Sequence, residues 1–447
     1  MSLYAFCQAF TLDHVPSPTR AILQKSLLDI LGTMAGAVSN ATSQTLYGYA
    51  RKHYPAGEFI ARLPFDGTPV NLLGAAWAGG FTADSLDAHE GHFTSKGHAG
   101  ATVVPALLAL ADALHAQGRR VSGRELLEAL CLGYETGLRA GVALMATSPT
   151  YHASGGFSGL GVVCGGARLL GLDETTFRHA VGIAEYFAAR CPMMRLIEHP
   201  TMLRDAHGAG AYNGLNALLL AREGVTGAPA ETLEAESASP FWSDLGCRWE
   251  IDVQYFKPWP VCRWAQPALT AMTRLLAKHP RLCADSLASV RVETFQESSC
   301  LQGQHPVNAD EAQYALAFPL AALIARGQVG PEEVTGAAIE APDILAVSER
   351  IEIVEAADLS ARFPEEILSR VTVRLTSGEV FTSPTTAALG DPQQPLTLAD
   401  IEAKFELFAG QNLTADARAA VKRAVLELEH SPLAIEALAP LFEPWDR

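Results

Sequence analysis

Histidine is the residue type whose positions in this sequence point most directly to chemistry. Eight of the 13 histidines fall between positions 89 and 207. His98, His152 and His207 each stand beside glycine or alanine in turn-like sequence, where small neighbours leave an imidazole ring open to a ligand. Because imidazole titrates near neutral pH, these histidines are candidates for a general acid or base.

Each of these histidines also has a simpler interpretation. His89 and His92, together with Asp87 or Glu90, have a spacing that a metal site could use. No HExxH motif or thiolate pair accompanies them, so a solvated loop or a contact to substrate are the alternatives. His98 precedes a strongly apolar stretch and could cap a helix instead of taking part in catalysis. His207 could be structural or could contact an anion.

A lysine on rigid backbone provides the second chemical signal. Lys257 is followed by Pro-Trp-Pro, which fixes a non-helical backbone, and Arg263 follows shortly after. Arg204 stands in an earlier loop. Guanidinium groups match carboxylates well, and several cations in an acidic protein could attract an anionic substrate. Ordinary surface charges are the alternative interpretation.

Three stretches must position these residues. Residues 1–266 are predicted to form a large helical domain, and 398–447 return to helix and are expected to pack back on it. Residues 267–397 are predicted to form a smaller α+β lid with a mostly antiparallel sheet. The protein is therefore expected to be mainly α. Apolar periodicity predicts helices at 21–38, 101–116, 124–145, 157–170, 175–189, 206–222, 311–326, 398–408, 414–428 and 432–441. Alternation predicts strands at 287–295, 350–354 and 370–375, with a hairpin turn at Ser377-Gly378.

Composition excludes several classes of protein. The net charge is 33 − 49 = −16 and no run of basic residues is present, so we expect no binding to nucleic acid. No apolar run reaches the length of a membrane span, and residues 1–15 lack the pattern of a secretory signal. The eight cysteines are scattered without a CxxC pair, which predicts a reduced, cytoplasmic protein. Gly159-Leu-Gly161-Val-Val-Cys164 only half matches a dinucleotide motif, and no phosphate-binding GxxxxGK[ST] loop occurs.

Four segments in order resemble the MmgE/PrpD family, which includes 2-methylcitrate dehydratases, cis-aconitate decarboxylases and an iminodisuccinate epimerase. They are DAHEGHFTSKGHAGATVVPALLA (87–109), YHASGGFSGLGVVCGGARLLGLD (151–173), KPWPVCR (257–263) and AQYALAFPLAAL (312–323). The resemblance implies an all-helical domain made from both chain ends, an α+β lid and a site in the cleft between them. It also implies a homodimer, no organic cofactor and no required metal.

The resemblance assigns site residues one by one. The positions that match the family's motifs are Asp87, His98, His152, Lys257 and Tyr314. The sequence departs from the family pattern in four places. Ala88-His89-Glu90-Gly91 stands where the family often has an aspartate-rich run ending in Thr or Ser, and Ala99 replaces the proline after His98. Arg204 stands where a loop lysine is familiar, and Cys262 stands where the decarboxylases resemble one another in having histidine.

The shared chemistry that the resemblance implies is removal of a proton from the carbon next to a carboxylate of a small di- or tricarboxylate. His152 and His98 are the expected proton-transfer pair, and Tyr314 would donate a proton or orient the leaving group. Asp87 would orient a histidine or bind a hydroxyl. Expected substrate contacts are Lys257, Arg204, Arg263, His207 and His89. Expulsion of hydroxide would make the enzyme a dehydratase, which we expect first. Reprotonation on the other face would make it an epimerase, and a catalytically dead binding protein on the same fold is the third possibility.

Overall fold

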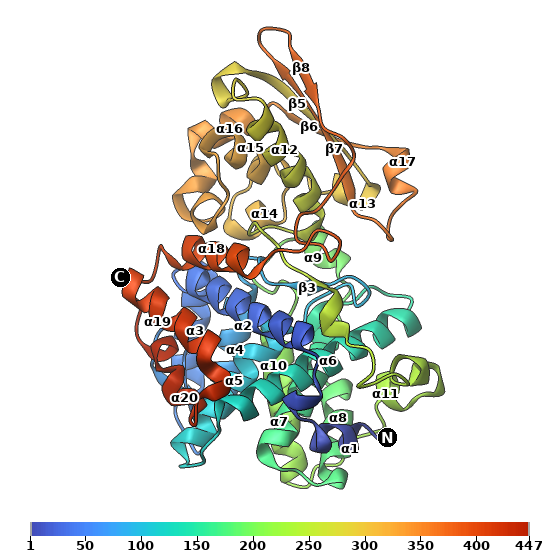
Figure 1. The fold of residues 1–447 in the computed structure, drawn as a ribbon, viewed down its shortest axis with the longest axis vertical. Helices are drawn as coiled ribbons and strands as arrows, with labels where there is room; N and C mark the ends of the chain where they lie inside the picture. Colours follow the sequence, from blue (N-terminus) through green and yellow to red (C-terminus); the bar gives the residue numbers. More distant parts are fainter. Residues whose placement is uncertain (1, 446–447) are drawn as a thin grey trace.

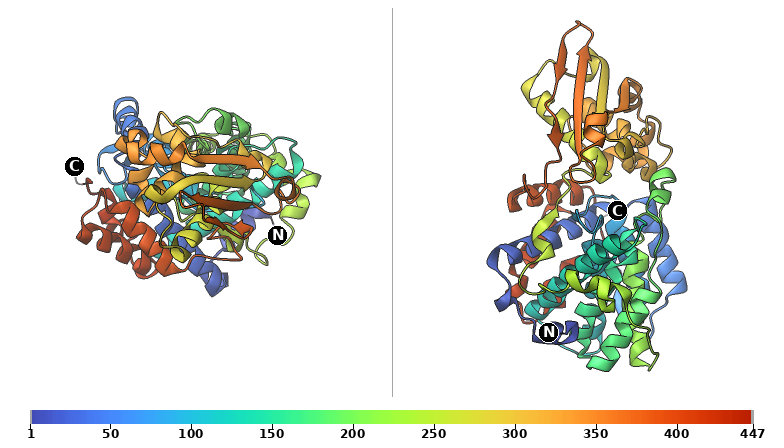
Figure 2. Two further views of the ribbon diagram at one scale, coloured as in Figure 1. Left: turned by 90° about the horizontal axis from the view of Figure 1, so that it is seen from above. Right: turned by 90° about the vertical axis from the view of Figure 1, so that its right-hand side faces the viewer.

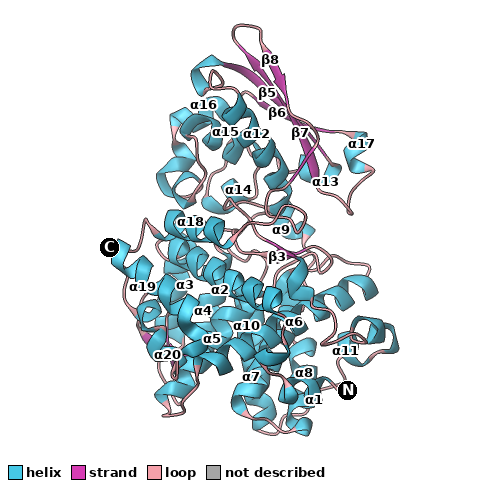
Figure 3. Cartoon of the chain, in the orientation of Figure 1, coloured by secondary structure: helices cyan, strands magenta, loops and turns pink. Residues whose placement is uncertain are grey.

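The computed structural model describes residues 2–445 and consists of two bodies joined at a narrow waist (Figure 1). The larger body is helical and combines the first half of the chain with its last helices. The smaller body holds the main sheet (Figure 3). The protein is mainly α with a smaller α+β part, as predicted.

The helical body is built from both ends of the chain. Its helices are α1 (Leu3–Ala9), α2 (Ser17–Ala37), α3 (Ala41–His53), α4 (Leu72–Asp84), α5 (Gly100–Ala116), α6 (Gly123–Thr147), α7 (Ser158–Leu170), α8 (Glu174–Tyr186), α9 (Met194–Glu198), α10 (His207–Arg222), α11 (Glu231–Glu234), α18 (Leu398–Ala409), α19 (Ala415–Glu427) and α20 (Ala434–Ala437). A short hairpin of β1 (Ile60–Arg62) and β2 (Pro69–Asn71) accompanies them, and β3 (Gly91–His92) pairs with β4 (Gln254–Tyr255), which is distant in the sequence.

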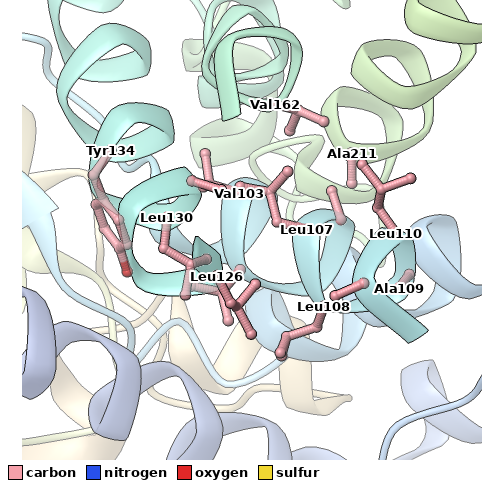
Figure 4. Packing of buried hydrophobic residues seen from close by; sticks show 14 of the residues in the cluster. Val103, Leu107, Leu108, Ala109, Leu110, Leu126, Leu130, Tyr134, Val162 and Ala211 are labelled. Atoms are coloured by element: carbon pink, nitrogen blue, oxygen red, sulfur yellow. The ribbon is translucent and has the colours of Figure 1, made fainter. Parts of the chain in front are cut away.

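Local sequence explains where these helices begin and how closely they pack. Ser122 accepts from the backbone N–H of Glu125, whose side chain in turn accepts from Ser122, and this capping box starts α6. A Cβ added at Gly161 of α7 would lie 2.1 Å from the carbonyl oxygen of Gly133 in α6, so glycine allows the close contact of the two backbones. Figure 4 shows the apolar side chains that fill the space around α5, including Val103 and Leu107.

The smaller body carries a five-stranded sheet. Its elements are α12 (Gln266–Lys278), β5 (Leu287–Thr294), α13 (Gln296–Ser299), α14 (Ala309–Gln313), α15 (Ala317–Arg326), α16 (Pro342–Ser348), β6 (Ile351–Glu355), α17 (Ala357–Ser360), β7 (Leu368–Leu375), β8 (Val380–Thr382) and β9 (Thr386–Ala387). The order is β6-β5-β7-β8, and β9 also pairs with β7. Only the β5–β6 pair is parallel among the described strands of this sheet, so the mostly antiparallel prediction is confirmed. Helix α12 packs against β7, and Figure 2 shows the sheet at the end remote from the helical body.

The predicted helix at 311–326 is wrong in one respect, because it is broken between α14 and α15. Pro319 has no N–H to donate, and in a continuous helix its ring would clash with the carbonyl of residue 315. The N–H of Leu316 bonds instead to the carbonyl of Leu301, at 2.7 Å. The break leaves Tyr314 at the C-terminal end of α14. The helix predicted at 432–441 is also shorter, since only α20 and a following 3₁₀ turn form there.

Two hydrophobic clusters follow the two bodies. The larger draws on residues 3–256 and 396–442, and the second mainly on residues 261–375. The division into 1–266, 267–397 and 398–447 follows the same pattern, and its boundaries remain a proposal. Among residues 2–445 no single helix is long and apolar enough to cross a membrane, although α2 and α3 reach that length when taken together across their 88° bend.

Candidate active site

A cavity of about 420 Å³ lies between the two bodies and gathers five of the predicted site residues. These five are Asp87, His98, Lys257, Arg263 and Tyr314. They come from separate places in the chain: the loop after α4, the entry to α5, the segment after β4, the turn before α12 and the end of α14. Pairing of β3 with β4 brings the loop that carries Asp87 close to the segment that carries Lys257.

Lys257 and Asp87 form an ion pair in the lining of the cavity. Lys257 Nζ lies 2.6 Å from Asp87 Oδ1 and 2.8 Å from the backbone oxygen of Asp87. Both side chains are buried in a region of low dielectric, where electrostatic interactions are strong. An ammonium group has three protons, and these contacts occupy two of them, which leaves one for a ligand in the cavity.

His98 reaches the cavity as a neutral imidazole. Its Nδ1 lies 2.6 Å from the backbone oxygen of Glu90, which can only accept, so Nδ1 carries the proton and Nε2 holds a free electron pair. Burial, together with the neighbouring His89 and Lys257, holds the pKa of His98 well below its usual range. The backbone N–H of His98 donates to Ser154 Oγ at 3.0 Å, which fixes the start of α5. Such an imidazole can accept a proton at Nε2.

Asp205 is a cavity residue that sequence reasoning missed. Its Oδ2 lies 3.6 Å from His98 Nε2, and its Oδ1 accepts from the N–H of Ser154 at 2.9 Å. Burial, with the nearby carboxylate of Asp84, raises the pKa of Asp205 to about 7. A carboxyl group with this pKa, beside a neutral imidazole in a cavity, has the properties of an acid–base partner. The only sequence signal was its position between Arg204 and His207.

Arg204 does not line the cavity, so its expected contact with substrate finds no support in the geometry. Its guanidinium lies 2.7 Å from both Asp310 Oδ1 and Gln313 Oε1, and it donates to the backbone oxygen of Asp84 at 3.3 Å. The terminal nitrogens of the Arg204 guanidinium thus contact protein groups. Arg204 ties the helical body to α14 and thereby helps to hold Tyr314 over the cavity.

Arg263 does line the cavity, and it is also paired. One of its terminal nitrogens donates to Asp391, and its guanidinium lies over the ring of Tyr255 at 4.2 Å from the ring centroid. Its Nε has no hydrogen-bond partner among the described residues and is buried. Arg263 therefore remains a candidate for a contact to a ligand through Nε.

His89 and His207 pack against His98 and are not among the residues that line the cavity. Their rings pack edge-on, 5.0 Å apart, and His89 also packs at 4.4 Å against His98. His207 Nδ1 lies 2.8 Å from Thr102 Oγ1. Both side chains are fully buried, so the expected direct contacts with substrate are not supported. The two rings instead pack against the ring of His98.

The metal alternative at Asp87, His89 and His92 is not supported. His92 lies 3.2 Å from Glu250, and Asp87 is held by Lys257. A different trio, Asp84, His89 and His207, brings one ligand atom each within 4.8 Å of the others. Burial raises the pKa of Asp84, and its Oδ1 already lies within hydrogen-bond distance of His89 Nε2, at 3.3 Å. We therefore interpret this trio as a hydrogen-bonded layer under His98.

His152 is the second predicted catalytic histidine, and the structure does not bring it to His98. Its Nε2 lies 3.2 Å from Ser148 Oγ, at the end of α6, and its neighbour Tyr151 lines the cavity in its place. The backbone of His152 pairs with Pro192 in an isolated bridge, which directs the chain this way. A role for His152 in proton transfer stays a prediction from the resemblance.

The hydroxyl and thiol groups of the cavity are neutral. Burial raises the pKa of Tyr314 well above its usual range and raises the pKa of Cys262 to about 12. Tyr314 is 5% exposed and faces the same cavity as Lys257. A neutral phenol in this position can donate a proton or a hydrogen bond to a ligand.

Comparison with known proteins identifies the family. Sequence models of the MmgE/PrpD N-terminal and C-terminal domains match residues 1–239 and 259–430. Human cis-aconitate decarboxylase is 24% identical over 92% of this chain and 88% of its own length. The cis-aconitate decarboxylase-like protein oryM of Aspergillus oryzae is 24% identical over 82% and 81%. Cis-aconitate decarboxylase of Aspergillus terreus is 22% identical over 84% and 82%. With models of both domains covering most of its length, this chain belongs to the MmgE/PrpD family.

Proposed function

We propose that this protein is a lyase that removes a proton from the carbon next to a carboxylate of a small organic acid, without a cofactor. The observation that carries the proposal is the placement of a free imidazole nitrogen, on His98, in the same buried cavity as the Lys257–Asp87 ion pair. Membership of the family and the names of its cis-aconitate decarboxylase relatives support a lyase acting on a carboxylate.

The first step assigns a base and its partner. His98 Nε2 takes the proton from carbon and becomes an imidazolium. The carboxylate of Asp205, on the Nε2 side of the ring, stabilises that positive charge. A base of suitable pKa that is placed in this way contributes about 10²–10⁴-fold to the rate.

The same step places negative charge on the substrate carboxylate, which becomes an enediolate. The remaining proton of the Lys257 ammonium donates to that oxygen, and Asp87 holds the ammonium in place. Because the site is buried, this interaction is stronger than it would be in water, and it needs no reorganisation during the reaction.

The second step decides the outcome. Proton donation by Tyr314 to a departing hydroxide gives dehydration, which is the outcome that we propose first. Return of a proton to the opposite face gives epimerisation, the runner-up. Loss of carbon dioxide is what the names of the relatives say of those proteins.

Proton NMR of a substrate panel tests the proposal. We would incubate the purified protein with 2-methylcitrate, citrate, cis-aconitate and iminodisuccinate, and follow loss of water, inversion and loss of carbon dioxide in the same spectra. Turnover of one acid that is lost in Lys257→Met supports the proposal. The matched control is Lys278→Met, because Lys278 is exposed at the end of α12. No turnover of any carboxylate, or equal turnover in Lys257→Met, would contradict it.

A further inference from the structure

The lining of the cavity combines polar and apolar side chains. The polar part includes the Lys257–Asp87 pair and His98. Six apolar side chains, which we call the apolar wall, belong to or pack against one hydrophobic cluster. They come from α9 and the residue before it, from the turn before α12 and from the segment that leads into β7. These side chains are Met193, Met194, Ile197, Trp264, Phe363 and Ile367. A small, highly charged acid would leave this wall without a partner.

The apolar wall is already packed and does not need a ligand to form. Phe363 stacks on Phe295 with ring centroids 4.6 Å apart, and Trp264 meets both rings edge-on at 6.0 and 6.2 Å. Met193, Ile197 and Trp264 are each less than a tenth exposed. A preformed apolar surface binds an apolar group with little cost in ordering.

The charges of the cavity do not suit a tricarboxylate. Its lining has three cationic side chains, on Lys96, Lys257 and Arg263, and three carboxyl groups, on Asp87, Asp205 and Glu297. With Asp205 ionised the sum is 3 − 3 = 0, and Arg263 is further paired with Asp391, outside the lining. Carboxylates beyond the one that reacts would compete with these carboxyl groups for Lys96 and for the Nε of Arg263, and burying any carboxylate that is left unmatched is costly.

We infer that the substrate of this site carries its reacting carboxylate next to Lys257 and a bulky apolar group, an alkyl chain or an aromatic ring, against the apolar wall. The inference rests on the proposed function for the position of the carboxylate. The cavity volume of about 420 Å³ has room for such a group. It falls within the ~300–1,000 Å³ of sites that bind ligands larger than a simple acid.

Calorimetric binding of three acids tests the inference separately from turnover. Succinate and 2-benzylsuccinate have the same charge and differ by the apolar group, and citrate adds a carboxylate. A single methylene in an apolar pocket changes discrimination by about 10–200-fold. We therefore expect 2-benzylsuccinate to bind at least about 10-fold more tightly than succinate, and citrate to bind most weakly.

A matched pair of lysine variants locates the effect. Met194 is half-buried on the wall, whereas Met202 is 40% exposed and lies outside the cavity. Met194→Lys should lower the preference for 2-benzylsuccinate over succinate by at least about 10-fold, and Met202→Lys should leave it unchanged. Melting temperatures of both variants check that the fold survives.

The outcomes separate this inference from the proposed function. Three results in the wild-type protein alone would each overturn the inference. They are binding of 2-benzylsuccinate that is no tighter than that of succinate, no binding of 2-benzylsuccinate at millimolar concentration, and binding of citrate that is the tightest of the three. An unchanged preference in a folded Met194→Lys protein also overturns it. If the preference is observed but no acid that binds exchanges the proton next to its carboxylate in D₂O, the inference stands and the proposed reaction fails.

Discussion

Replacing Asp205 by asparagine is the sharpest perturbation of the proposed proton transfer. The two side chains have the same shape, and the asparagine oxygen can keep the bond from the Ser154 N–H, now 2.9 Å from Oδ1. The new amide NH₂ would then point to His98 Nε2, 3.6 Å from the present Oδ2. It would donate to the electron pair that must accept the substrate proton, and it would remove the charge that stabilises the imidazolium.

The magnitude follows from the two losses. General-base catalysis contributes about 10²–10⁴-fold. Replacing the carboxylate that orients and stabilises a catalytic imidazole costs up to about 10⁴-fold in kcat in an unrelated hydrolase that serves as the reference case. We therefore expect kcat of Asp205→Asn to fall by about 10²–10⁴-fold, with a smaller change in KM, because Asp205 acts mainly on charge that forms in the transition state.

The pH profile distinguishes this role from a structural one. The pKa of Asp205 is raised to about 7, and the ionised form is the active one. The wild-type rate should therefore rise as the pH rises through about 7, and Asp205→Asn should lack this limb. Asp285→Asn, at an exposed position, is the control. A folded Asp205→Asn protein with a wild-type rate and profile would refute the assignment.

Three further predictions concern stability and metal. Burial and the nearby Asp29 raise the pKa of Glu90 to about 8, so the native state binds more protons than the unfolded state between its ordinary pKa and 8, and stability falls as the pH rises through that window. Between about pH 5.5 and 8, the free energy of unfolding measured with urea should fall by about 3 kcal/mol less in Glu90→Gln than in the wild-type protein. An equal fall in both proteins would contradict this. Lys257→Met leaves the buried Asp87 unpaired and should lower the free energy of unfolding by about 3–5 kcal/mol, partly restored in the double variant with Asp87→Asn; additive losses would argue against the pair. Treatment with EDTA should leave turnover unchanged, whereas a stoichiometric metal in elemental analysis, lost together with activity, would contradict our interpretation of the layer under His98.

The sequence predicted the elements better than it predicted the orientation of the residues between them. Apolar periodicity located α2, α5, α7 and α10, because a helix that buries one face must repeat along the chain. The break before α15 was missed, although Pro319 marks it. Its effect depends on the carbonyl of residue 315, which periodicity does not report.

The loop before α10 shows why part of the site could not be predicted. Arg204 and Ala206 both adopt left-handed backbone, with φ of 45° and 58°, which is uncommon for residues other than glycine. This backbone places Asp205 in the cavity and leaves Arg204 in contact with α14. A pattern of residue types favoured the arginine and the histidine on either side, since their charge and chemistry are evident without the fold.

Burial explains the remaining differences. His89 and His207 are residue types that often contact substrate. Both are fully buried and do not line the cavity, so they do not reach a ligand there. Lys257, Asp87, His98 and Tyr314 were predicted from motifs, and the β3–β4 pairing and α14 bring them to one cavity.

Deuterium exchange tests the central claim, proton removal next to a carboxylate, most directly. We would incubate the acid that binds best in D₂O with wild-type protein, His98→Gln and Lys278→Met, and follow the proton on the carbon next to the carboxylate by NMR. We predict exchange in the wild-type and Lys278→Met proteins and loss of exchange in His98→Gln. The absence of exchange for every acid that binds, or equal exchange in His98→Gln, would contradict the account.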